Sequence, residues 1–502
     1  MDTLPPLSLC VGRIFRLAAR RTPNRVAASL AGRRLTFLEV QVMADRLALA
    51  LHHHGVGIGD RVVWWGDTTL DAVPLFAALA QIGAVFAPVN ARLAADEAAP
   101  VLELADPTLV VTDDSRAADG DVTLNALFEV AGRERADREM AGQEIAASLS
   151  VLPELAEIDE LAAHVIFFTS GSTGRSKGVV LSHRANVLRT MPGNAATPGG
   201  PTVCMFPLFH MAAWSIALGC WQAADEVAFV EQADAPTLLA TVEARRARRL
   251  YAIPAVWGRI LAELSARPDA ARLDSLREAD TGTSATPPEL VAAIREALPN
   301  TLTRIMYGST EAGPAATLGP DDLERKPGSV GLPAAGVELD LADDGELLVR
   351  SPFLMSGYFR DEQATSAALA GGWYHTGDLG VLDEEGYLSI VGRANDLIRT
   401  GGEAVAPPEV EAAIVTHPAV ADAAVVGLAD TEWGERVCAV VVLQPGSDID
   451  LDGLRRHLRG RLAPFKHPRR LVITRELPRT AATGQLQRTL LAEQLSLGRL
   501  LE

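Results

Sequence analysis

The chain has 502 residues, of which 48% are hydrophobic and 22% are charged, a composition typical of globular proteins rather than disordered or fibrous ones. One hydrophobic core does not suffice at this length, so we expect at least two domains. The formal net charge of −18 argues against a nucleic-acid-binding surface. An anionic substrate must therefore be attracted by a local positive site.

Cysteine usage and the first residues predict a cytoplasmic protein. The four cysteines are scattered, without the paired spacing of a disulfide framework or a zinc site. The N-terminus lacks the basic segment and apolar stretch of a signal peptide. The most apolar long stretch, 70–89, is interrupted by Asp71, Pro74, Gln81 and Pro88. It predicts a helix followed by a strand, and no membrane span.

The first part of the chain alternates between predicted strands and helices. Apolar residues at helical spacing predict helices over residues 14–19, 37–52 and 70–81. Short apolar runs bounded by turn residues predict strands over residues 26–30, 34–36, 62–65, 85–89 and 109–112. This alternation implies a parallel sheet covered on both faces. Residues 113–160 show only a weak, charged pattern, typical of a loop with peripheral helices.

A loop of small residues follows the apolar run that ends at Phe167 and Phe168. Three glycines and several hydroxyl residues leave backbone N–H groups free to converge on an anion, and Lys177 adds a point charge. The loop residues are Thr169, Ser170, Gly171, Ser172, Thr173 and Gly174. The pattern predicts a triphosphate-binding loop that is not a Walker loop, because no Gly-Lys-Ser/Thr precedes a helix. The alternative is a flexible linker, although linkers seldom lie between two apolar runs.

The remaining elements suggest a second α/β unit, a β-subdomain and a C-terminal α+β unit. Strands are predicted over residues 202–206, 227–230 and 249–253, with alternating segments over 346–351 and 386–391. Arg245, Arg246, Arg248 and Arg249 form a basic cluster that we interpret as a solvated helix end, with a phosphate contact as the alternative. Beyond residue 395, helices are predicted over 407–416 and 451–462, and strands over 422–428, 436–444 and 470–474.

The loop from Thr169 to Gly178 resembles the phosphate loop of the adenylate-forming superfamily, which includes acyl- and aryl-CoA ligases, luciferases and the adenylation domains of peptide synthetases. Further stretches match this family in order, so the resemblance covers nearly the whole chain. It implies an α/β fold with a large N-terminal domain over 1–394, containing parallel sheets and a β-subdomain. A small, mobile α+β domain would follow over 395–502. ATP and Mg²⁺ are the implied cofactors.

Two stretches resemble the family's adenine and metal motifs. Thr281, Gly282, Thr283 and Ser284 resemble the turn that lies against adenine. The run Tyr307, Gly308, Ser309, Thr310 and Glu311 resembles the Tyr-Gly-x-Thr-Glu signature. There the tyrosine stacks on adenine, the threonine hydroxyl reaches the α-phosphate and the glutamate holds Mg²⁺. An aromatic plate and a hard oxygen ligand suit these tasks.

Two later positions resemble the ribose contacts of the family. Asp378 matches the aspartate that binds both ribose hydroxyls, since a carboxylate can accept two hydrogen bonds at once. Arg393 matches a second ribose or phosphate contact, for which a permanently charged planar side chain is suited. A lone residue of either type would more often lie on the surface without a function.

The resemblance also implies an acid pocket. His210 matches an aromatic position that gates this pocket in CoA ligases, a role without proton transfer, although a lone histidine is more often a core residue. The pocket candidates are His210, Met211, Trp214, Tyr251, Gly308 and Gly313. No arginine or lysine matches a pocket position that would hold a second carboxylate, which disfavours dicarboxylic acids.

The C-terminal region resembles the hinge and CoA-binding segments of the family. Asn395 occupies the hinge position, where Asp or Lys is usual, and Gly401 and Gly402 match a loop that flanks the pantetheine tunnel. Trp433 is a candidate for stacking on the adenine of CoA, with a packed core tryptophan as the alternative. CoA is therefore the expected acceptor substrate.

Gln485 departs from the family pattern, because it occupies the place of the catalytic lysine in the C-terminal loop. That lysine bridges the acid oxygen and the α-phosphate, and a neutral amide supplies no charge there. The loop also contains one extra residue between Pro478 and Gly484. Arg479 and Arg488 are candidates to replace the missing charge.

Three functions remain open from the sequence. The first is an ATP-dependent acyl- or aryl-CoA ligase that joins a small acid to CoA. The second activates a non-standard acid such as nitrite and transfers it to an aryl amine in a natural-product pathway, and a carrier protein is a further possible acceptor. The third is a catalytically weak nucleotide-binding protein, since Gln485 replaces the lysine. Both monomer and homodimer are compatible with the sequence.

Overall fold

The computed structural model describes residues 8–118, 120–130, 158–170, 176–191, 199–267, 273–400, 403–431, 433–480 and 484–498, without the side chains of Ser170 and Asn395. The chain packs as two compact units. The first comprises Met1–Arg325, Ala334–Glu338 and Arg350–Tyr374, and the second comprises Lys326–Pro333, Leu339–Val349 and His375–Glu502. A domain boundary near residue 395 stays a prediction. Within the described residues, no helix has the length and apolar character needed to cross a membrane.

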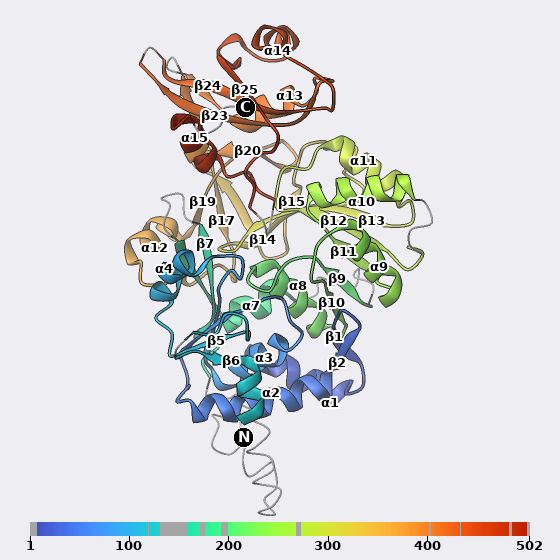
Figure 1. Cartoon of the computed structure of the whole chain (residues 1–502), viewed down its shortest axis with the longest axis vertical. Coiled ribbons are helices and arrows are strands. Elements are labelled where there is room, and N and C mark those ends of the chain that lie inside the picture. The colour runs from blue at the N-terminus through green and yellow to red at the C-terminus, as the bar shows by residue number, and fades with distance from the viewer. Residues whose placement is uncertain are drawn as a thin grey trace, which may run out of the picture. The chain divides into compact units, whose positions relative to one another are not determined.

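A seven-stranded sheet in the first unit, of which Figure 1 labels β5, β6 and β7, includes the strands β7 and β8 on either side of the predicted phosphate loop. Its spatial order is β18 (Gly357–Tyr358), β8 (Ser176–Ser182), β7 (Ala163–Ser170), β4 (Val85–Pro88), β3 (Arg61–Trp65), β5 (Leu109–Thr112) and β6 (Val122–Thr123). Strands β3, β4 and β5 are parallel, whereas β7 and β8 form an antiparallel pair. Helices α3 (Ala72–Ile82) and α4 (Ala95–Ala105) belong to the same region. Buried Val63, Ala87, Val101 and Ile166 form part of one core.

A second sheet of the first unit carries the adenine and metal motifs. Eight of its strands are, in spatial order, β14 (Gly313–Leu318), β13 (Leu302–Ser309), β12 (Glu278–Gly282), β11 (Arg249–Tyr251), β9 (Thr202–Cys204), β10 (Val227–Phe229), β1 (Val26–Leu30) and β2 (Arg33–Thr36). Pairing is parallel from β13 to β1 and antiparallel at the β13–β14 and β1–β2 pairs. The carboxyl ends of parallel strands meet at one edge, where ligands commonly bind in such sheets.

Helices accompany both sheets of the first unit. They are α1 (Gly12–Arg21), α2 (Phe37–His53), α7 (His183–Arg189), α8 (Met211–Gln222), α9 (Ala235–Arg245), α10 (Pro254–Ala266), α11 (Pro288–Ala297) and α12 (Glu362–Ala368). Helix α2 begins with a capping box, in which Thr36 and Glu39 exchange side-chain-to-backbone hydrogen bonds. The expected α/β fold class is confirmed.

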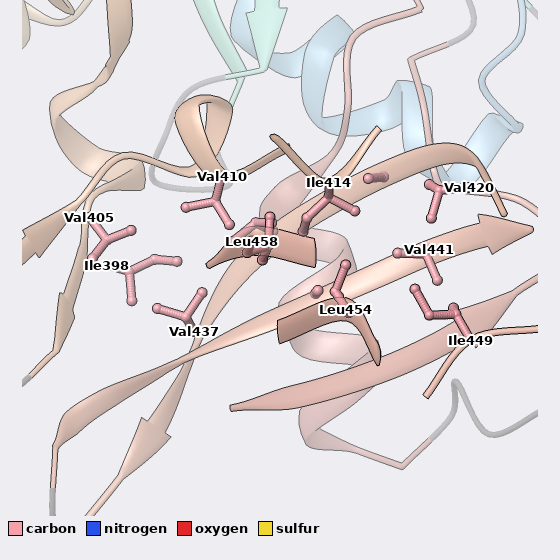
Figure 2. Close-up of a cluster of buried hydrophobic side chains, with 13 residues drawn as sticks. Ile398, Val405, Val410, Ile414, Val420, Val437, Val441, Ile449, Leu454 and Leu458 are labelled. Carbon is pink, nitrogen blue, oxygen red and sulfur yellow. The ribbon is translucent and has the colours of Figure 1, made fainter. Parts of the chain in front are cut away.

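The C-terminal part of the second unit is a five-stranded sheet packed against helices. Its elements are β21 (Ile398–Thr400), β22 (Glu403–Val405), α13 (Pro407–Ile414), β23 (Val420–Asp430), β24 (Gly434–Leu443), α14 (Leu451–Leu458), β25 (Arg470–Thr474) and α15 (Arg488–Ser496). Figure 2 shows Val410 and Ile414 of α13 beside Leu454 and Leu458 of α14, in one buried cluster with Val441. Each such buried side chain stabilises the folded state by about 1.5–3 kcal/mol relative to an exposed one.

The β-subdomain is a four-stranded sheet, and its strands position the candidate ribose contacts. The spatial order is β16 (Glu338–Leu341), β17 (Glu346–Arg350), β19 (Tyr374–Leu382) and β20 (Leu388–Arg393), and the short β15 (Leu332–Pro333) precedes them in the chain.

Element boundaries largely agree with the sequence pattern. The predicted strand over 26–30 is β1, and the helix predicted over 37–52 is α2. The helix predicted over 451–462 is too long, because α14 ends at Leu458. Gly460 follows with φ 77°, a left-handed conformation that favours glycine and ends helices.

Candidate active site

The hairpin of β7 and β8 positions the phosphate loop. Thr169 pairs with Lys177 and Ser170 with Ser176 at the open end of the ladder. The loop residues Gly171, Ser172, Thr173 and Gly174 lie outside the described residues. Gly178 is required by packing, because a Cβ there would lie 2.9 Å from Ile166 Cγ2.

Lys177 lies over an aromatic ring that also contacts the candidate metal ligand. Its Nζ is 4.6 Å from the centroid of the Tyr358 ring, within cation–π range. The Tyr358 hydroxyl donates a hydrogen bond of 3.2 Å to Glu311 Oε1. Lys177, Tyr358 and Glu311 therefore form a connected group, which brings the phosphate-loop hairpin together with the end of β13.

Two tyrosines accompany Glu311. Tyr358 and Tyr374 are hydrogen-bonded to each other, and Tyr374 is also bonded to the side chain of Ser309. Burial, together with the nearby Glu311 carboxylate, raises the pKa of both phenols. Both therefore remain protonated donors at neutral pH. Sequence analysis did not assign either tyrosine a function, because neither lies in a recognised position of the Tyr-Gly-x-Thr-Glu run.

The adenine turn follows β12 and has a constrained backbone. Gly282 has φ 156°, and a Cβ there would lie 2.1 Å from the backbone oxygen of Met306. Thr283 has φ 74°, which a β-branched residue rarely adopts. Its hydroxyl is 3.1 Å from the Tyr251 hydroxyl, and burial raises the pKa of Tyr251 to about 12. Strained backbone of this kind concentrates at functional sites, and Ser284 follows at the exposed end of the turn.

The turn between β13 and β14 depends on close backbone approach. A Cβ on Gly308 would lie 2.2 Å from the backbone oxygen of Gly313, so only glycine fits. Tyr307 pairs with Ala316 in this ladder, and Thr310 and Glu311 follow in the turn itself. The structure thus brings the residues of the predicted signature together at one strand end.

His210 begins α8 with its ring stacked on Phe206. The ring centroids are 5.3 Å apart, and His210 Nδ1 accepts a hydrogen bond from the Ala212 N–H. Burial lowers the pKa of His210 to about 4, so the ring is neutral at pH 7. A neutral, stacked ring suits gating better than proton transfer. The Met211 sulfur lies next in the chain, 2.8 Å from the Ser215 hydroxyl.

Trp214 occupies a different position from the one expected. Its side chain is 2% exposed and stacks on Phe76, with ring centroids 4.1 Å apart. Its indole N–H donates to the Leu208 backbone oxygen at 2.6 Å. These contacts place Trp214 in the core, and we leave it out of the proposed pocket.

The candidate ribose contacts pair with each other. Asp378 of β19 is opposite Arg393 of β20, and Asp378 Oδ1 lies 3.0 Å from Arg393 Nε. Asp378 is 8% exposed, and its N–H donates to the Thr376 hydroxyl. The pair presents one carboxylate and one guanidinium side by side.

The C-terminal loop holds Gln485 in a hairpin-like turn. The Gln485 N–H donates to the Thr480 hydroxyl, and its carbonyl oxygen accepts from the Thr480 N–H. Both arginines near Gln485 are paired with carboxylates. Arg479 Nη2 donates to both carboxylate oxygens of Asp422, and Arg488 pairs with Glu411 and Asp396. Neither arginine is therefore available in this structure to replace the missing lysine.

The hinge and CoA candidates are only partly described. Gly401, Gly402 and the side chain of Asn395 lie outside the described residues. Trp433 stacks with Arg469, whose guanidinium carbon is 3.7 Å from the ring centroid. The ring is half-buried rather than packed in the core.

Sequence analysis missed a buried charge cluster beside the adenine strand. Arg249 binds Asp280 at 2.6 Å, and Arg304 binds both Asp280 and Glu278. Arg245, in turn, binds Glu226 with two hydrogen bonds of 2.7 Å. The interpretation of Arg245 and Arg249 as a solvated helix end is wrong, because Arg249 pairs with Asp280 of β12 and Arg245 pairs with Glu226, which directly precedes β10. Only contacts between segments separated in the sequence bring these groups together.

Comparison with known proteins decides the family. Residues 15–359 match the model of the AMP-binding enzyme family, and residues 409–483 match that of the AMP-binding enzyme C-terminal domain. The chain belongs to this family. An indoleacetate–CoA ligase from Aromatoleum aromaticum is 32% identical over 481 residues, covering 91% of this chain and 93% of the relative. Membership and such relatives identify the chain as an AMP-forming ligase close to acyl- and aryl-CoA ligases.

Solved structures of family members share the fold. The o-succinylbenzoate CoA synthetase from Bacillus subtilis, in complex with its acyl-adenylate intermediate, has a TM-score of 0.83 at 26% identity, covering 95% of this chain and 97% of that one. The same synthetase has been solved with ATP and a magnesium ion. An amide bond synthetase from Marinactinospora thermotolerans has a TM-score of 0.80 at 28% identity, covering 97% of this chain and 99% of that one.

The donor set of the family's metal motif fits magnesium bound through a nucleotide. No group of three or more His, Cys, Asp or Glu side chains able to hold a metal occurs among the described residues. Mg²⁺ is commonly held by one or two carboxylates together with substrate phosphates and water. Glu311 supplies one carboxylate, with a hydrogen bond from Tyr358 at Oε1.

Proposed function

We propose that this ligase activates a small monocarboxylic acid with Mg²⁺·ATP, releases pyrophosphate, and transfers the acyl group from the adenylate to CoA. The observation that carries the proposal is the connected group of Lys177, Tyr358 and Glu311. It supplies a cation and a hard anionic ligand at the end of the phosphate-loop hairpin. A bound magnesium ion would neutralise phosphate charge there.

The chain's own side chains have distinct roles in this proposal. Lys177 and the loop Thr169, Ser170, Gly171, Ser172, Thr173 and Gly174 bind phosphate oxygens, and Thr310 donates to the α-phosphate. Tyr307 and the turn Gly282, Thr283 and Ser284 bind adenine, beside Gly308 and Ser309. Asp378 accepts from the ribose hydroxyls and Arg393 holds its carboxylate in place. Glu311 binds the metal.

The acid pocket in this proposal is lined by apolar or neutral groups. His210, Met211, Tyr251, Gly308 and Gly313 surround the acid. His210 is neutral at pH 7, since burial lowers its pKa to about 4. The nearby cations Arg249 and Arg304 are already paired with Asp280 and Glu278, which are both fully buried. Arg189, beside Gly313, donates instead to the backbone oxygens of Thr310, Glu311 and Phe353. A second carboxylate on the substrate therefore finds each of these three cations already engaged.

Gln485 favours a second candidate, an acceptor other than CoA. Without the family's lysine, adenylation lacks a positive charge on this loop, and Arg479 and Arg488 are occupied by carboxylates. A chain adapted to this state would activate a different acid, such as nitrite, and pass it to an amine. The similarity to an amide bond synthetase supports an amine acceptor.

Pyrophosphate release with a panel of acids and nitrite tests both candidates. We expect release with at least one acid, and the acceptor is then found by adding CoA, an aryl amine or a carrier protein to the adenylate. Glu311→Gln should lower the rate by about a hundredfold or more, because it removes the anionic metal ligand. Asp322→Asn, which removes a half-buried carboxylate paired with Arg325, is the matched control. Release that is equal in the Glu311 variant and the wild type would refute the metal site.

A further inference from the structure

Arg189, the last residue of α7, is a buried cation without a carboxylate in ion-pair distance among the described residues. Its side chain lies in the interior, with 6% of the residue exposed. Burial lowers the pKa of the guanidinium to about 10, and the charge of Glu311 opposes that shift. Burying an unpaired charge is costly unless hydrogen bonds replace its hydration. The contacts of the Arg189 guanidinium therefore explain why this charge can lie in the interior.

The guanidinium donates to three backbone carbonyls on two segments. Nη1 donates to the Thr310 oxygen at 2.9 Å, and Nη2 donates to the Phe353 oxygen at 2.6 Å and more weakly to the Glu311 oxygen at 3.5 Å. Thr310 and Glu311 form the turn between β13 and β14. Phe353 lies in the segment that leads to β18 and Tyr358.

The residues around Arg189 leave room for its guanidinium. Gly313 has φ 72°, and a Cβ there would lie 3.3 Å from both Nε and Cζ of Arg189. The Glu311 oxygen also accepts a hydrogen bond of 2.8 Å from the Met355 N–H, which ties the same two segments together. The planar fork of arginine reaches both segments at once, which the single amino group of lysine does with poorer geometry.

Arg189 also connects this turn to the phosphate-loop hairpin. Helix α7 follows β8 directly, and Ser182 caps its first turn by accepting from the Ala185 N–H. Strand β8 carries Lys177 at its other end. One short helix therefore links the lysine strand to the carbonyls that hold the Glu311 turn.

We propose that Arg189 is a positioning residue that fixes the Glu311 turn for binding of Mg²⁺·ATP. The inference rests on the proposed role of Glu311 as the metal ligand. Arg189 touches neither metal nor nucleotide in this proposal; it holds the backbone from which Glu311 extends. Its loss should therefore weaken binding of the metal–nucleotide complex more than binding of AMP, which needs no magnesium.

Calorimetric titration of ATP with magnesium, and of AMP with EDTA, tests the proposal on Arg189→Met and Arg189→Lys. We expect Arg189→Met to weaken Mg²⁺·ATP binding by about 10- to 100-fold and to raise the magnesium concentration for half-saturation, with AMP binding changed less than about threefold. Arg189→Lys keeps the charge and should fall between Arg189→Met and the wild type. Arg189→Lys also tests the proposal if Arg189→Met does not fold.

The control is Arg245→Met, which breaks the buried pair with Glu226 and tests for general destabilisation. It should lower thermal stability without changing the magnesium dependence. Equal weakening of AMP and Mg²⁺·ATP binding by Arg189→Lys, or no change in either, would overturn the positioning role. Absence of magnesium-dependent ATP binding in the wild type would instead refute the proposed function.

Discussion

Asp378 lies opposite Arg393 in the β19–β20 ladder, where its carboxylate contacts the guanidinium. Oδ1 lies 3.0 Å from Arg393 Nε, and the residue is 8% exposed. Asp378→Ala should weaken ATP binding by about 10- to 100-fold, because hydrogen bonds to a charged acceptor contribute about 1.5–3 kcal/mol. Calorimetric titration measures this directly. Asp383→Ala, at the turn after β19, is the matched control, and equal losses in both variants would contradict a ribose contact.

Gln485 raises the question of whether the chain is a damaged ligase or an adapted one. Its two neighbouring arginines are both paired with carboxylates, so a lysine at 485 would add a charge that the loop lacks. If the chain is an ordinary ligase, Gln485→Lys should increase single-turnover AMP formation by at least about tenfold, since one preorganised electrostatic donor contributes roughly 10²–10³ in rate. Thioester formation from a preformed adenylate should change little.

The outcome of the Gln485→Lys experiment separates the two readings. A large gain with the same acid would rule out adaptation around Gln485. No gain would rule out a merely damaged ligase. We expect this result, because the family resemblance implies one extra residue between Pro478 and Gly484, which a single substitution does not add. Gln487→Lys places the same charge two residues further along the loop and controls for charge alone.

At the scale of elements, the residue pattern predicted those helices and strands that depend mainly on their own sequence. Strand β1 and helix α2 followed from apolar spacing and turn residues. The phosphate loop, the Tyr-Gly-x-Thr-Glu run and the C-terminal loop, which the order of motifs suggested, stay predictions. The partners of each element were not predictable. Arg189 meets Thr310 across 121 residues, and β1 pairs with β10, so only the folded chain reveals these contacts.

The turn at Ala394–Asp396 joins β20 to β21 and carries the candidate hinge. Asp396 is paired with Arg488 of α15, so this turn is linked to the helix that follows the Gln485 loop. Asn395→Pro fixes φ near −65° and removes an N–H. If the turn is a hinge, the substitution should leave one half-reaction nearly intact and slow the other by about tenfold or more, since the family resemblance implies a different domain orientation for each.

Separate assays of AMP formation and of thioester formation from a preformed adenylate measure the effect on the hinge. Asn395→Gly increases backbone freedom at the same position and is the control, with both half-reactions expected to stay within a few fold of the wild type. Equal slowing of both half-reactions by proline would argue against a hinge at this turn.

At the scale of the whole molecule, the net charge is −18, so the binding of an anionic substrate depends on local positive charges. Lys177 and Arg189 supply positive charge on either end of the segment from β8 to α7, whereas Arg249, Arg304, Arg479 and Arg488 are consumed by carboxylates. Raising the salt concentration screens exposed charges most and buried ones least.

Two buried histidines of the first unit make the stability of the folded chain sensitive to acid. His164 and His183 are both fully buried, with ring centroids 4.6 Å apart. His183 Nδ1 accepts a hydrogen bond from the Val11 N–H, and His164 Nδ1 lies 3.0 Å from Asn186 Nδ2. Burial lowers the pKa of His164, an effect that His183 reinforces, and it lowers the pKa of His183 to about 4 despite the nearby charge of Asp159. Both rings are therefore neutral in the folded chain.

The folded chain should lose stability as the pH falls from about 6.5 to about 4, because the unfolded chain takes up protons in this range and the folded chain resists them. For His183 alone, lowering the pKa from 6.5 to about 4 corresponds to roughly 3 kcal/mol. Thermal melts across this range should show a falling Tm, less steep in His183→Asn, whose amide oxygen can accept the Val11 N–H without titrating. His53→Asn, at an exposed position of α2, should melt with the wild-type slope. An identical slope for His183→Asn and the wild type would exclude this histidine as the acid-sensitive group.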